Sequence, residues 1–255
     1  MYFDGELFTV HVPKTGGSSL KRILTSLRDG DRRPGGGHDT LWMHSGIASS
    51  ATVLVTIRCP AEWYCSLYLH ATSTEHGRDQ LRVWGKGFLG FEDILKGWVA
   101  PRKVPGLAGL TTLAGIAHPG VRGLPEDFDR VQHLLDSGLG FASWYWLYAM
   151  CKPTDPQWPV VGRGCGRLAL IDTADIYGGV AAALNVSVSE VSKVPPQNHR
   201  YVRDTWRARP PVYQDWYTPA MLDRVREVDG ALLRLVGRPD LFCRAEQPVT
   251  WLEVN

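Results

Sequence analysis

The stretch His11–Leu20 reads HVPKTGGSSL and brings together residue types that bind anions. Its lysine supplies a positive charge, its two glycines let the backbone approach a ligand closely, and its two serines supply hydroxyls at a helix start. The order of these residues predicts a loop that holds a phosphate group at the N-terminus of a helix. The candidate binding residues are Lys14, Thr15, Gly16, Gly17, Ser18 and Ser19.

A second group of chemically suitable residues follows the apolar run Ala51–Ile57, where the chain continues RCPAEWYCSLYLH. Arg58 can bind an anion through a forked set of donors, and Ser66 can add a hydroxyl from the helix that follows. Both groups come directly after apolar, strand-like runs. The sequence therefore predicts two neighbouring exits from strand to helix, each with an anion-binding residue.

The elements that position these residues alternate between strands and helices. Leu7–Val12 is a short apolar run, Ala51–Ile57 is continuous and β-branched, and RLALID at 167–172 indicates another buried strand. Helical patterns cover 18–28, 61–72, 91–99, 126–138, 141–150, 173–185 and 219–237. We expect an α/β domain with a central parallel sheet of about four or five strands, flanked by helices on both faces.

The length and composition favour one packed domain that spans residues 1–255. Hydrophobic residues make up 44% and charged residues 21% of the chain, which argues against a disordered or fibrous protein. Residues 76–125 are rich in glycine and proline. We interpret them as an insertion that faces the substrate, with a purely structural insertion as the alternative.

Charge and cysteine content narrow the expected partners. A net charge of +2 without a long basic block argues against a nucleic-acid partner. The sequence lacks a signal peptide and an apolar run of roughly 18 residues, so we expect a cytoplasmic protein without a membrane partner. Its five cysteines form no C-x-x-C pair, which favours reduced thiols and indicates no metal site.

Two common nucleotide-binding motifs do not fit the first loop. A P-loop requires G-x-x-x-x-G-K-[ST], whereas Lys14 precedes Gly16 and Gly17. A dinucleotide-binding G-x-G-x-x-G needs a third glycine that GGSS does not supply.

The loop instead resembles the 5′-phosphosulfate-binding loop of sulfotransferases that use 3′-phosphoadenosine 5′-phosphosulfate (PAPS), especially the carbohydrate sulfotransferase branch. That family's 3′-phosphate site reads R-x-P-x-x-R-x-x-S-x-Y, and RCPAEWYCSLY is similar to it at Arg58, Pro60, Ser66 and Tyr68. Trp63 stands where the second arginine is usual. The resemblance implies a P-loop NTPase-like sulfotransferase fold, PAPS as donor, adenosine 3′,5′-bisphosphate (PAP) as product, and no metal.

The same resemblance implies a role for each matching residue. Lys14 would contact the oxygen that bridges sulfate and 5′-phosphate, and the amides of 15–19 would hold the 5′-phosphate. Arg58 and Ser66 would bind the 3′-phosphate. In the late stretch VPPQNHRYVRDTW, Asn198, Arg200 and Arg203 would close over the nucleotide. The acceptor would be a hydroxyl of a carbohydrate or a small molecule.

An acceptor hydroxyl also needs a proton acceptor, and histidine suits neutral pH. The resembling families often place this base in a G-H-x-x-apolar pattern, which GHDTL matches at His38. His44 is the second candidate. Some sulfotransferases use a carboxylate instead, which leaves Glu62 and Glu75 as alternatives.

Two other functions stay open at this point. A kinase-like enzyme of the P-loop type would need an acidic residue at a strand end, and Asp172 after LALI is placed for it. A non-catalytic protein that binds PAPS without turnover is the other alternative. No residue pattern identifies the acceptor or an oligomeric state.

Overall fold

A computed structural model describes residues 2–12, 14–28, 41–44, 46, 49–73, 90–99, 137–150, 165–195, 213–243 and 245–252. Its strands are β1 (Leu7–Val10), β2 (Thr52–Ile57), β3 (Arg167–Asp172) and β4 (Val249–Leu252). The α-helices are α1 (Gly17–Leu27), α3 (Pro60–Ser73), α5 (Phe91–Val99), α8 (Phe141–Met150), α9 (Ile176–Leu184), α10 (Val188–Val191) and α12 (Pro219–Leu235). Three short 3₁₀ helices complete the described elements: η1 (Leu41–His44), η4 (Thr173–Asp175) and η5 (Tyr213–Trp216).

Within the described residues, the strands form one four-stranded sheet in the order β1-β2-β3-β4. The first three strands are parallel, with Val10 opposite Val55 and Ile57 opposite Asp172. The prediction of an α/β fold with a sheet of about four strands is therefore confirmed. The predicted parallel sheet is confirmed for β1, β2 and β3, whereas β4 runs antiparallel to β3.

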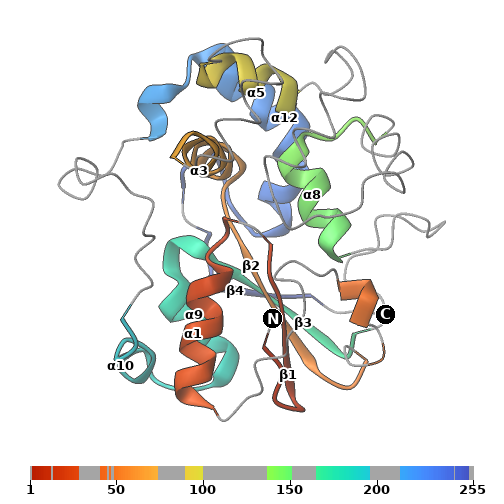
Figure 1. The fold of residues 1–255 in the computed structure, drawn as a ribbon, viewed down its shortest axis with the longest axis vertical. Coiled ribbons are helices and arrows are strands. Elements are labelled where there is room, and N and C mark those ends of the chain that lie inside the picture. The colour runs from red at the N-terminus through yellow and green to blue at the C-terminus, as the bar shows by residue number, and fades with distance from the viewer. Residues whose placement is uncertain are drawn as a thin grey trace.

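Helices cover both faces of the sheet, as expected, and each face has its own apolar core. On one face, Leu7, Leu54 and Ile171 pack with residues of α1 and α9. On the other, side chains of the alternate strand positions, such as Val55 and Leu170, pack with α3, α5, α8 and α12. Figure 1 shows these two groups of helices on opposite sides of the strands. Both faces are buried, which explains the continuous apolar runs of the strands.

The ends of two helices follow from local sequence. Thr218 caps α12, because its hydroxyl accepts a hydrogen bond from the Met221 amide and Pro219 begins the helix. Asp175 caps α9 in the same way by accepting from the Gly178 amide at 3.0 Å, and Asn185 ends that helix at a φ of 55°. These caps fix where the helices begin and end beside the sheet.

A buried carboxylate joins three helices on one face. Asp229 of α12 accepts a hydrogen bond from the Tyr64 hydroxyl of α3 at 2.8 Å and from the Ser143 amide of α8 at 2.9 Å. Gly140 leaves room for this carboxylate, since a Cβ there would lie 2.4 Å from Asp229 Oδ2. Burial raises the pKa of Asp229 to about 6, although the Ser143 and Tyr64 hydrogen bonds oppose that shift. Asp229 thus caps the first turn of α8.

Most of the glycine-rich and proline-rich segment 76–125 lies outside the described residues, which include only 90–99 of it. The helix predicted there is confirmed as α5. Its role in facing a substrate stays a prediction. Among the helices that the structure describes, none combines the length and apolar character needed to cross a membrane.

Candidate functional site

The loop after β1 adopts an unusual backbone conformation at two positions. Lys14 has a φ of 62° and Gly16 a φ of 85°, both in the left-handed region. A non-glycine residue in this region is uncommon and is found often at functional sites. Gly16 is also the N-cap of α1, so the helix begins at Gly17, and Ser18 and Ser19 follow in its first turn.

The two glycines are required by different neighbours. A Cβ on Gly16 would demand a strained backbone and would lie 3.2 Å from the Thr173 methyl group. A Cβ on Gly17 would lie 2.2 Å from His11 Cδ2, so the imidazole ring packs directly on this glycine. The ring of His11 therefore lies against the start of α1.

The start of α1 offers unused backbone donors. The amides of Ser19 and Leu20 both donate to the Gly16 carbonyl, at 2.9 and 3.0 Å. Within the part of the chain that the structure describes, the amides of Gly17 and Ser18 have no acceptor. A helix N-terminus with free amides attracts negative charge. The geometry is therefore suited to an anion, and binding of an anion by this loop stays a prediction.

Three threonines fasten this loop to the ends of the neighbouring strands. The Thr15 hydroxyl lies 2.8 Å from the Thr56 hydroxyl of β2 and donates to the Val12 carbonyl at 2.7 Å. The Thr173 hydroxyl, which follows β3, faces the carbonyls of Thr15 and Ile57 at 2.7 and 2.6 Å. Sequence analysis missed Thr56 and Thr173. Their only signal was a hydroxyl residue at the carboxyl end of a strand.

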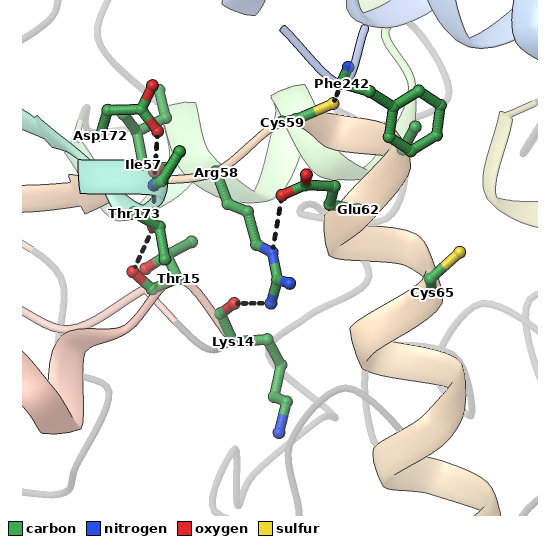
Figure 2. A network of polar contacts seen from close by, with 12 residues as sticks. Lys14, Thr15, Ile57, Arg58, Cys59, Glu62, Cys65, Asp172, Thr173 and Phe242 are labelled. Carbon is green, nitrogen blue, oxygen red and sulfur yellow. Dashed lines mark hydrogen bonds and ion pairs between the residues drawn. The ribbon is translucent and has the colours of Figure 1, made fainter. Parts of the chain in front are cut away.

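Arg58 lies against this loop (Figure 2). Its Nη1 donates to the Lys14 carbonyl at 3.2 Å, and its Nε lies 3.4 Å from Glu62 Oε2 one helical turn later. The Tyr213 ring of η5 packs 5.6 Å from the guanidinium carbon, which is a cation–π contact. Figure 2 shows the Lys14 carbonyl turned toward Arg58 and the Lys14 side chain extending away from it.

The two cations of the site affect each other. Burial of the Lys14 amine, and then the nearby charge of Arg58, lower the pKa of Lys14 to about 8. Two neighbouring positive charges with one half-buried carboxylate beside them form a local excess of positive charge. A bound anion would relieve this repulsion, which is the usual electrostatic property of an anion site.

The other residues of the second motif lie along α3. Ser66 is half-buried and follows Glu62 by one helical turn, so the two occupy the same helix face. Tyr68 is half-buried against Phe91 and Trp216. Trp63 is buried against Phe141 and Tyr145 of α8. Position 63 thus belongs to the core, which explains why this chain places a tryptophan where the resembling pattern has a second arginine.

Two of the four candidate bases, His44 and Glu62, lie within the described residues. His44 of η1 packs against the Phe8 ring of β1, with ring centroids 5.4 Å apart. Glu62 pairs with Arg58, as described above. Outside the described residues lie His38, Glu75, Asn198, Arg200 and Arg203. Their assignments stay predictions.

Asp172, the acid that a kinase-like enzyme would need, already has a structural role. It ends β3 and pairs with Arg238, whose side chain is 1% exposed. Its Oδ1 also accepts from the Ala174 amide and its Oδ2 from the Ala245 amide, each at 2.9 Å. Both carboxylate oxygens are thereby occupied by protein donors, which leaves this residue poorly placed to bind a metal-nucleotide complex.

Two cysteines beside Arg58 do not add a reactive group. The Cys59 thiol accepts a hydrogen bond from the Phe242 amide at 3.4 Å, and burial raises its pKa. Burial raises the pKa of Cys65 to about 12. The cysteines that the structure describes at 59, 65, 165 and 243 are all free thiols. In these described ranges, no cluster of three or more His, Cys, Asp or Glu residues is arranged to hold a metal ion.

Comparisons of the chain with family models, with curated proteins and with solved structures find no match.

Proposed function

We propose that this protein is a sulfotransferase that moves the sulfuryl group of PAPS to a hydroxyl of a carbohydrate or small-molecule acceptor. One observation carries the proposal: Arg58, from the second motif, donates a hydrogen bond to the carbonyl of Lys14, from the first. PAPS carries negative charge at both the 3′ and the 5′ position of one ribose. A protein that recognises it needs two anion-binding groups close enough for one nucleotide to reach both.

The residues have distinct roles in this proposal. The amides of Gly17 and Ser18, which have no acceptor among the described residues, and the N-terminus of α1 hold the 5′-phosphate. Arg58 binds the 3′-phosphate, with Ser66 of the following helix α3 as a further donor. Lys14 neutralises the charge that develops on the leaving oxygen as the acceptor hydroxyl attacks the sulfur. A lysine with a pKa of about 8 still carries its proton in most molecules at pH 7.

The test is transfer of labelled sulfate from PAPS to a panel of carbohydrate and small hydroxyl acceptors, followed together with release of PAP. Lys14→Met should lower the rate by about 10²–10³, because a positioned charged donor to the leaving oxygen is lost. Lys193→Met is the matched control, since Lys193 is exposed after α10. Wild-type turnover in Lys14→Met, or no PAP release with any acceptor, would reject the proposal.

A kinase-like enzyme is separated from a sulfotransferase by its need for a metal. We expect transfer from PAPS to continue in a chelator, because no step of the proposed mechanism uses a metal. Phosphoryl transfer from ATP that stops in the chelator would favour the alternative instead.

A further inference from the structure

The contacts of Arg58 point to a second role that goes beyond binding a phosphate. An arginine that only bound the 3′-phosphate would need to contact the ligand and the groups that orient its own guanidinium. Arg58 also touches the backbone of the residue that carries the catalytic lysine side chain, through the 3.2 Å hydrogen bond to the Lys14 carbonyl. That carbonyl faces Arg58 in a segment where Lys14 has a left-handed φ of 62°.

Left-handed backbone in a lysine is costly and persists only when neighbouring groups hold it. On one side, the Thr173 hydroxyl holds the next carbonyl, that of Thr15, at 2.7 Å. On the other side, the Arg58 guanidinium donates a hydrogen bond to the Lys14 carbonyl. The conformation that aims the lysine is thus supported by a residue of the second motif.

The guanidinium can support the loop and bind an anion at the same time. Of its five N–H groups, one on Nε faces Glu62 and one on Nη1 is used by Lys14. Within the described residues, the second Nη1 hydrogen and both Nη2 hydrogens have no acceptor. Contacts with Glu62 and with the Tyr213 ring fix the orientation of the guanidinium, and with it the direction of these remaining N–H groups.

We propose that Arg58 is a positioning residue for the Lys14 loop, so that contact with the 3′-phosphate is transmitted to the group that acts at the 5′ end. Only the identity of the ligand rests on the proposed sulfotransferase function; the contact between arginine and loop does not. A 3′-phosphate on the free donors would immobilise the guanidinium and, through it, the Lys14 carbonyl. It would also offset the Arg58 charge, which adds to the larger effect of burial in lowering the Lys14 pKa.

The first test needs no ligand. Arg58→Met keeps the unbranched apolar stem of the side chain but removes its donors, so hydrogen exchange of the Ser19 and Leu20 amides should accelerate about tenfold. Exchange in β2 and β3 should not change. Arg167→Met is the matched control, because Arg167 also packs on an aromatic ring, that of Trp251, at 4.3 Å. Unchanged exchange at the start of α1 would overturn the proposal, and so would a uniform increase across the sheet.

The pKa of the Lys14 amine is a second measurement. It distinguishes an electrostatic effect of Arg58 on Lys14 from a general loosening of the loop. The rate of acetylation of the Lys14 amine, measured against pH by mass spectrometry, reports its pKa. Arg58→Met should raise this pKa above about 8, whereas Arg58→Lys, which keeps a cation, should hold it near the wild-type value. An equal pKa in wild type and Arg58→Met would contradict the electrostatic part of the coupling.

The last comparison uses adenosine 5′-monophosphate, which has no 3′-phosphate. If Arg58 only binds a 3′-phosphate and supplies a charge, Arg58→Lys, which keeps the cation but not the forked donors, leaves the affinity for this nucleotide unchanged. If Arg58 also positions the loop, the affinity falls about tenfold, since the 5′-phosphate site is itself disturbed. Failure of the wild-type protein to bind this nucleotide or PAP would count against the proposed function, while the exchange measurement would still decide the role of Arg58.

Discussion

Two arginine–carboxylate pairs lie at neighbouring strand ends and differ in what they leave free. Arg238 and Asp172, after β3, are 1% and 4% exposed, and every carboxylate oxygen has a protein donor. Arg58 and Glu62, after β2, are 17% and 25% exposed, and their closest contact is 3.4 Å. The first pair has little capacity for a ligand, whereas the second keeps donors that have no acceptor among the described residues. The difference separates a pair whose groups are all used by the protein from a pair that is still able to contact an anion.

The largest effect is expected at the buried pair. Arg238→Met leaves the Asp172 carboxylate buried without its cation, so the free energy of unfolding should fall by about 3–5 kcal/mol. Chemical denaturation measures this change. Arg226→Met is the matched control, because Arg226 pairs with Asp240 at the surface and such pairs contribute at most about 1 kcal/mol. Similar losses in both variants would contradict the distinction between the pairs.

A second buried carboxylate extends the comparison, because its partners are uncharged. Asp229 has a folded-state pKa of about 6 against an ordinary value of 3.8, so the folded protein binds this proton more tightly than the unfolded chain does. The stability that the Asp229 proton contributes is therefore complete below about pH 4. It is lost as the pH rises to 6, and the loss amounts to about 3 kcal/mol of the free energy of unfolding.

Asp229→Asn should remove that dependence. The difference in the free energy of unfolding between the variant and wild type should shift by about 3 kcal/mol in favour of the variant from pH 4 to pH 7. This shift does not depend on the size of the difference at pH 4. Unfolding in denaturant at several pH values measures the difference, with Asp215→Asn as the exposed control. Parallel pH profiles for wild type and Asp229→Asn would show that the Asp229 proton is not linked to folding.

The smallest effect is expected at the half-buried pair of Arg58 and Glu62. Glu62→Gln should change the free energy of unfolding by less than about 1 kcal/mol, because the pair is partly solvated and its geometry is loose. Affinity for PAP should rise by about threefold, since a negative charge beside the anion site is removed. A loss of stability comparable to that of Arg238→Met would make the two pairs equivalent.

The strands that position the site could be predicted because they are buried on both faces. Thr52–Ile57 and Arg167–Asp172 form continuous apolar runs, and such runs are typical of central parallel strands. The strand Val249–Leu252 was missed for the opposite reason. It has four residues, none of them fully buried, and it lies at the end of the sheet order. Edge strands carry little hydrophobic signal.

Only part of the candidate site could be predicted from the sequence. The Lys14 loop and Arg58 were recognised because their residue types and spacing are unusual. The contact between the Arg58 guanidinium and the Lys14 carbonyl, and the role of Thr173 between the loop and β2, could not be predicted. They join residues that are 44, 158 and 116 positions apart, and only the order of the strands determines that these residues meet.

The most direct measurement is calorimetric titration of the wild-type protein with PAP and with adenosine 5′-monophosphate under the same salt conditions. If one bisphosphorylated nucleotide spans the Lys14 loop and Arg58, PAP should bind at a single site at least about tenfold more tightly than the monophosphate. Equal affinities, or no binding of PAP, would contradict the assignment of these two strand ends to one nucleotide.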